Sequence, residues 1–187
     1  MVVAFKDKDR VTIGLSDWVL EATNQREYLM NIENLPLMMC EDSHVLVVAP
    51  VTCRSTDVLL TDEAFFHMMN GHKITHNYLV KTVVPYVKDK LSNEGVLEHD
   101  LWMEGIIIAD DKNIWKIDRD FYVEDAENFA VLDLRDEFIT GILLQNKHLS
   151  GKDRIVDTFE GYASYYNDMT YPVATIDTKA SAPDLII

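Results

Sequence analysis

The sequence predicts an α+β protein in which two stacked β-sheets lie between two layers of helices, a four-layer αββα sandwich. The segments follow the order strands, two helices, strands, two helices, strand, without the alternation of a βαβ fold. Several strand segments, such as residues 44–49 and 106–109, are apolar on consecutive positions, so both of their faces must be covered. The chain has 187 residues, of which 48% are hydrophobic, and this suits one domain over residues 1–187.

The chain begins with MVVAFKDKDRVTIGLSD, which predicts a β-hairpin made by the first residues. An apolar run starts at Val2, a charged patch covers residues 6–10, and apolar residues then alternate at Val11, Ile13 and Leu15. Chain ends are usually loose unless something holds them. A first residue inside a sheet therefore needs a structural or chemical reason.

Two strands and two helices are expected next. Residues 35–40 pair with residues 44–49 across a polar turn, and Pro50 ends the second strand. A helix over residues 54–69 stops near Gly71. A second helix over residues 75–91 has its apolar side chains on one stripe and is expected to kink at Pro85.

The second half of the chain predicts three strands, two helices and a last strand, followed by an irregular acidic tail. The strands cover residues 106–109, 114–117 and 129–132. Amphipathic patterns place one helix around residues 138–143 and the other at residues 155–166, after a break at Ser150-Gly151. The final strand is expected at residues 173–176.

Composition limits the classes of partner. The chain has 17 basic and 32 acidic residues, a formal charge of −15, so its surface repels nucleic acid and anionic membranes. Two cysteines, Cys40 and Cys53, are too few for a disulfide scaffold, and no apolar run approaches the ~20 residues of a membrane span. There is no basic-then-apolar targeting signal at the start. We expect a soluble cytoplasmic protein.

Three other groups of residues are candidate sites. His67, His72 and His76 have spacings that can bind a metal, but surface histidines are the better interpretation. The pair Asp110-Asp111 suits a hairpin turn without a cation. Cys53 follows a strand and precedes a helix, where a thiol pKa can fall, but no base is paired with it in the sequence. We therefore expect no metal and no cofactor.

The segments VVAFKDKDRVTIGLSD, GIIIADDKNIWKID and LLQNKHLSGKDRIVDTFEGYASYYNDMTYPVATID carry a resemblance to a known family. The chain resembles proteasome β-type subunits and the bacterial peptidase HslV, which are N-terminal nucleophile hydrolases, over about residues 1–179. The resemblance implies the αββα sandwich and assembly into rings. It also implies that residue 1 is the catalyst, with its own α-amino group as the base, which explains a first residue held in a sheet.

The family's nucleophile and lysine are not matched. The family begins with Thr, whereas this chain has Met1, and a thioether is no nucleophile for acyl transfer. Removal of Met1 would expose Val2, which also has no nucleophile. Asp17 matches the family's Asp at the end of the first hairpin. The family's Lys should fall near residues 32–35, which read Ile-Glu-Asn-Leu.

The remaining site positions also differ. The Gly whose N–H stabilises the oxyanion is replaced by Ala49-Pro50, and Pro50 has no N–H to donate. A Ser-Gly-Ser turn is replaced by the turn that begins at Asp133. The family's Asp before the last strand corresponds to Asn167 or Asp168. Met1, Asp17, Pro50, Asp133 and Asp168 are thus the positions of a vestigial site.

Two functions follow from this pattern. The first is a proteasome-subunit-like protein without the threonine-peptidase site, which self-assembles and has a structural or regulatory role, with a peptide or protein partner. The alternative is an active amide hydrolase that uses a processed N-terminus or another nucleophile such as Cys53. A fold alone does not decide between them.

Overall fold

The computed structural model describes residues 1–187 except 19–34, 50–53, 97–104, 134, 167–168 and 187. Its ten strands form two antiparallel five-stranded sheets, with the orders β10-β9-β2-β1-β8 and β3-β4-β5-β6-β7. The first sheet contains β1 (Val2–Lys6), β2 (Val11–Trp18), β8 (Phe129–Leu132), β9 (Met169–Asp177) and β10 (Asp184–Ile186). The second contains β3 (Leu37–Cys40), β4 (Val45–Val48), β5 (Gly105–Ala109), β6 (Ile114–Asp118) and β7 (Val123–Ala126).

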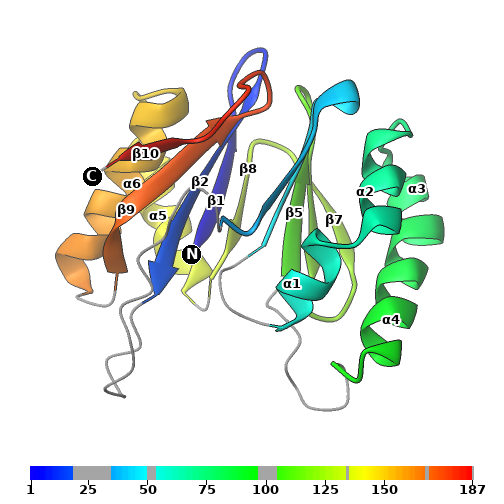
Figure 1. Ribbon diagram of the computed structural model, residues 1–187. Coiled ribbons are helices and arrows are strands. Elements are labelled where there is room, and N and C mark those ends of the chain that lie inside the picture. The colour runs from blue at the N-terminus through cyan, green and yellow to red at the C-terminus, as the bar shows by residue number, and fades with distance from the viewer. Residues whose placement is uncertain (19–34, 50–53, 97–104, 134, 167–168, 187) are drawn as a thin grey trace.

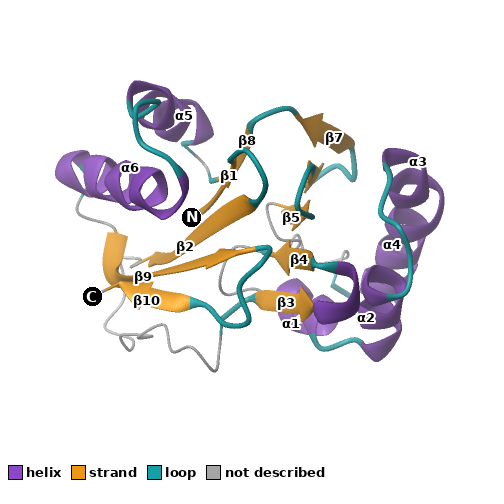
Figure 2. Cartoon of the chain, turned by 90° about the horizontal axis from the view of Figure 1, so that it is seen from above, coloured by secondary structure: helices purple, strands orange, loops and turns teal. Residues whose placement is uncertain are grey.

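Helices lie on the outer faces of the two sheets (Figures 1 and 2). The first sheet is covered by α5 (Asp136–Gln145) and α6 (Gly151–Tyr165). The second sheet is covered by α1 (Arg54–Leu60), α2 (Glu63–Asn70), α3 (His76–Tyr78), the π-helical turn η3 (Leu79–Val83) and α4 (Val84–Asn93). None of the helices in the described ranges is long and apolar enough to cross a bilayer.

Strand alternation produces three apolar clusters. Val2 and Ala4 face the second sheet, where they pack with residues such as Ile107. Val3 and Phe5, one position along, face α5 and α6. The third cluster lies between the second sheet and helices α1 to α4. Both faces of the central strands are therefore buried, which explains their continuous apolar runs.

The first predicted helix is wrong in one respect, because residues 54–69 form two helices. The chain leaves α1 after Leu60, and the Asp62 carboxylate then accepts the backbone N–H groups of Ala64 and Phe65 at 2.8 and 3.1 Å. This N-cap starts α2 in a new direction. Asp62 also bonds Tyr86 and Lys90 of α4, so the break joins two helices of the layer.

At Pro85, where a kink is expected, the helix contains a π-helical turn over residues 79–83. Proline has no N–H for the carbonyl four residues earlier, and the Val84 N–H donates to the Leu79 carbonyl five residues earlier.

Two strands differ from the expectations from the sequence. Strand β7, which pairs with β6, is not among the predicted strands. The C-terminal tail, predicted to be irregular, contains β10, which pairs with β9. The last long strand is also longer than expected, since it covers Met169–Asp177.

Candidate functional site

The site predicted around residue 1 lies at the start of the interior strand β1, which pairs with β2 on one side and β8 on the other. The β1–β2 register pairs Val2 with Leu15. One position earlier, the α-amino group of Met1 donates to the Ser16 carbonyl at 3.1 Å, and the Ser16 N–H donates to the Met1 carbonyl at 3.0 Å. Residue 1 thus continues the ladder of the hairpin through two hydrogen bonds to Ser16.

Asp133 supplies a buried negative charge beside the α-amino group. Val2 pairs with Leu132 at the end of β8, which brings the next residue, Asp133, next to Met1. Its Oδ2 lies 4.0 Å from the Met1 nitrogen, and its side chain has no exposed surface. Its Oδ1 accepts the Arg135 N–H at 2.9 Å, which orients the carboxylate. A buried ammonium needs such a partner, because an uncompensated charge in the interior is costly.

The side chain of Met1 faces the helical layer. Met1 is 2% exposed and belongs to the same cluster as Val3, Ile155 and Phe159. The next side chain, that of Val2, points the opposite way and faces the second sheet. The thioether is therefore packed among apolar groups from α5, α6 and the sheet.

Ser16 is a member of this site that the sequence analysis missed. Its side chain is 1% exposed, and its Oγ has no hydrogen-bond partner in the described part of the chain. The hairpin register could have identified Ser16. If the turn covers residues 7–10 and Lys6 lies opposite Val11, residue 1 lies opposite residue 16. The site therefore contains an amine, a carboxylate and a hydroxyl, all closed off from solvent.

Arg135 links the site residue Asp133 to aromatic side chains at the end of α6. Its guanidinium donates to the Tyr162 hydroxyl and lies 4.2 Å from the centroid of the Tyr166 ring. Phe138 packs edge-on against both tyrosines. An arginine stacked on aromatic rings keeps its charge while its planar face is covered by apolar atoms.

Of the predicted vestigial positions, the structure brings Met1 and Asp133 together. Asp17 lies in β2 directly after a register shift between Ser16 and Asp17. Pro50 and Asp168 lie outside the described residues. The same holds for Asn167, for Cys53 and for residues 32–34 of the predicted lysine region.

The three histidines and Asp110 each have separate contacts in the described part of the chain. His67 lies 3.7 Å from Glu63 in α2, the Nδ1 atom of His76 lies 2.8 Å from a carboxylate oxygen of Asp125 in β7, and His72 packs on Tyr78. Within the described ranges, no group of three or more His, Cys, Asp or Glu side chains could hold a metal ion. The Asp110 carboxylate caps its own turn, since it accepts the N–H groups of Lys112 and Asn113.

Comparison with protein-family models and with curated proteins gives no match to the sequence. Solved structures do match. BPH of Thiobacillus denitrificans in complex with epoxomicin has 9% identity and a TM-score of 0.65, over 94% of this chain and 96% of that chain. Eukaryotic HslV from Trypanosoma brucei has 9% identity and a TM-score of 0.61, over 94% and 97%.

Anbu from Yersinia bercovieri, described as an ancestral beta-subunit, has 7% identity and a TM-score of 0.66, over 99% of this chain and 86% of that chain. At such low identity these likenesses concern the fold. The mixed fold with two antiparallel sheets and flanking helices agrees with them. This chain therefore has the HslV-like and proteasome-like fold of the N-terminal nucleophile hydrolases.

Proposed function

We propose that this chain is a proteasome-subunit-like protein of the four-layer αββα type that lacks the threonine-peptidase site and acts as a self-assembling structural or regulatory protein. The observation that carries the proposal is the side chain of Met1. It stands where the resemblance puts the nucleophile, it is buried in the helix-side cluster, and a thioether cannot attack a carbonyl.

The contacts of the α-amino group support a structural role for this end of the chain. The group donates to the Ser16 carbonyl and lies beside the Asp133 carboxylate. Both contacts fasten β1 in the sheet.

Self-assembly is supported by apolar side chains on the outside of both helical layers. Leu144 of α5 and Tyr165 of α6 are 51% and 73% exposed, and Val80 in η3 is 44% exposed. Exposed apolar groups on helix faces favour contact with another protein surface. The likeness to a structure described as a beta-subunit agrees with a role in an assembly. With two cysteines and an acidic surface, we place this role in the cytoplasm.

The test uses epoxomicin, the ligand of the BPH complex. The protein is incubated with epoxomicin, and with fluorogenic peptides, beside an active proteasome-type peptidase as the positive control. We expect no covalent mass increase and no peptide turnover. A Met1→Thr variant, made with a cleavable leader so that Thr is the first residue, should also stay inactive. It still has Pro50 in place of the oxyanion donor, and it still lacks the Lys. Losing one oxyanion donor alone costs roughly 10²–10³ in rate.

The location of any label decides the alternative. Stoichiometric labelling of residue 1 would overturn the proposal. Labelling of Cys53 would establish an amide hydrolase with a different nucleophile. The intact mass of protein from its native source, measured in parallel, identifies the residue that bears the free α-amino group.

A further inference from the structure

A pocket of about 400 Å³ opens at the far end of the first sheet from Met1. It lies between the β1–β2 hairpin, the turn that joins β9 to β10, and the first turn of α6. The strand β1 separates it from the Met1 site by five residues, or about 17 Å. The pocket is thus independent of the site discussed above, and its size suits a small molecule.

Two threonine side chains lie at the base of this pocket. Thr12 of β2 and Thr175 of β9 are 4% and 3% exposed and belong to neighbouring strands. Among the described residues, neither hydroxyl takes part in a hydrogen bond. Neither hydroxyl oxygen is among the fully buried atoms without a partner, so both face the solvent that fills the pocket and can bond a ligand that replaces this water.

The N-terminus of α6 is directed at the same place. Gly151 begins this 15-residue helix, and the preceding residue, Ser150, makes no side-chain capping bond. The Thr12 Oγ1 lies 3.7 Å from the position that a Cβ on Gly151 would occupy. Free N–H groups and the positive end of the helix dipole attract an anionic group here.

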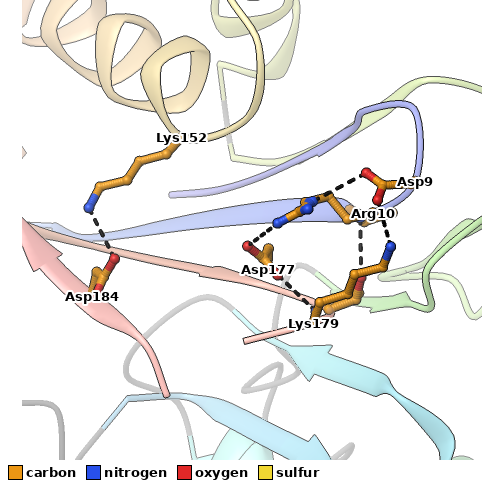
Figure 3. A network of polar contacts seen from close by, with 8 residues as sticks. Asp9, Arg10, Lys152, Asp177, Lys179 and Asp184 are labelled. Carbon is orange, nitrogen blue, oxygen red and sulfur yellow. Dashed lines mark hydrogen bonds and ion pairs between the residues drawn. The ribbon is translucent and has the colours of Figure 1, made fainter. Parts of the chain in front are cut away.

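Aspartate carboxylates surround the part of the pocket formed by the two threonines and the start of α6. Asp7 Oδ2 lies 3.8 Å from the same Cβ position of Gly151. Asp184 forms an ion pair with Lys152 at 3.1 Å, and Asp177 forms one with Arg10 at 3.3 Å (Figure 3). Lys152 and Asp184 are 48% and 71% exposed, and ion pairs on a surface contribute little, so both side chains can turn toward a ligand.

We propose that this pocket binds a small zwitterion of the amino-acid or short-peptide class. Its carboxylate accepts hydrogen bonds from the hydroxyls of Thr12 and Thr175 and from the first N–H groups of α6. Its ammonium group lies against the carboxylates of Asp7 and Asp184. A doubly charged anion such as phosphate fits less well, because four aspartates line the pocket beside three cationic side chains.

The test follows methyl NMR signals of the threonines, which remain observable in a large assembly, while glycylglycine is added to the full-length protein. We expect saturable shifts of the Thr12 and Thr175 methyl signals. Thr175→Val keeps the shape of the side chain but removes the hydroxyl, and should weaken binding about tenfold. The double variant Thr12→Val/Thr175→Val lacks both reporter signals, so its affinity is measured by isothermal titration calorimetry beside the wild type, and binding should be abolished. Thr82→Val, at an exposed position in η3, is the matched control and should bind like the wild type.

Three results would overturn the proposal. The first is the absence of saturable shifts in the wild-type protein. The second is an equal response to acetate or to ethylammonium alone, which would reduce the pocket to an adventitious ion site. The third is unchanged affinity in a double variant whose remaining methyl spectrum matches that of the folded wild type. None of these results bears on the absence of the threonine-peptidase site, since no variant touches Met1.

Discussion

The buried carboxylate of Asp133 should contribute to stability, because it lies beside the α-amino group of Met1. Its carboxylate is fully buried 4.0 Å from the α-amino nitrogen of Met1. Asp133→Asn keeps an oxygen for the Arg135 N–H but removes the charge that balances the ammonium, so we expect the free energy of unfolding to fall by about 3 kcal/mol. Urea denaturation measures this loss.

Asp136→Asn is the matched control for that measurement. Asp136 is 50% exposed, and its contact with Lys116 is 3.9 Å long. Exposed pairs of this kind contribute at most about 1 kcal/mol. Equal stability losses in the two variants would refute a special role for the Asp133 charge.

Cys40 should be chemically silent while the protein is folded. Burial raises the pKa of the Cys40 thiol from 9.0 to about 12, and the thiolate is the reactive form. Iodoacetamide at neutral pH should modify Cys40 only after denaturation, as peptide mapping will show. Modification of Cys40 in the folded protein would contradict the burial of β3.

The same pKa shift predicts how stability depends on pH. A thiol whose folded pKa is raised makes its full contribution below 9.0, and this contribution is lost as the pH rises from 9.0 toward about 12. The stability of the wild type should therefore fall more steeply over this range than that of Cys40→Val. Parallel curves for the two proteins would contradict the shift.

At the scale of elements, Asp62 joins the start of α2 to α4. It caps two N–H groups of α2, accepts the Tyr86 hydroxyl at 3.0 Å and pairs with Lys90 at 2.7 Å, while its side chain is 6% exposed. Asp62→Ala should lower the free energy of unfolding by about 2–3 kcal/mol, measured by denaturant titration. Glu63→Ala, whose side chain is 91% exposed in the same turn, should change it by less than about 0.5 kcal/mol.

The contribution of Asp62 to stability should be lost at low pH. Burial by itself raises the pKa of Asp62, but hydrogen bonds from Lys90, the Phe65 N–H and Tyr86 hold the pKa below its usual value of 3.8. A lowered folded pKa means that the contribution is present above 3.8 and is lost as the pH falls through the folded value. Asp62→Ala should lose this part of the acid sensitivity.

Close packing of α6 on the first sheet depends on Gly14 of β2. A Cβ there would lie 2.2 Å from Ile155 Cγ2 and 2.8 Å from a ring carbon of Phe159. Gly14→Ala should therefore lower the melting temperature, with a loss of about 2 kcal/mol. Gly141→Ala in α5 has no neighbour within 4 Å of the new Cβ and should instead stabilise the helix by roughly 0.5–1 kcal/mol.

The elements that were predicted from the sequence have strong local signals. The hairpin of β1 and β2 follows from alternation around a charged turn, and the buried strands follow from apolar runs. The break before Asp62 was missed because the apolar stripe continues across it. Strand β7 was missed because its sequence, VEDA, is charged; as an edge strand it has one pairing partner, β6.

The candidate site was predicted in part for a similar reason. The family resemblance implies both Met1 and Asp133 as site positions, and the hairpin pattern adds only that residue 1 lies in a sheet. The buried hydroxyl of Ser16 depends on the pairing register between two strands. The threonines of the second pocket depend on where α6 begins relative to β2 and β9. Such tertiary positions have no local pattern in the sequence.

The whole molecule has an acidic surface with a formal charge of −15, and it also has exposed apolar side chains on both helical layers. Net charge of this size opposes non-specific aggregation. Apolar side chains that remain exposed despite it favour a specific contact. The helices, rather than the sheets, form the outer faces of the molecule, so copies of the chain can meet through them (Figure 2).

The last prediction concerns assembly. Light scattering of the wild-type protein should give a mass well above the 21.5 kDa of one chain at micromolar concentrations. The double variant Leu144→Gln/Tyr165→Gln removes apolar area from α5 and α6, and Val80→Gln removes it from η3; each should shift the protein toward the monomer. Tyr122→Gln is the matched control, because Tyr122 is 66% exposed but lies before β7, outside the helical layers, and its loss should leave the mass unchanged. A wild-type mass of one chain throughout this range would refute self-assembly, and dissociation of Tyr122→Gln alone would place the contact at the edge of the second sheet instead of on the helices.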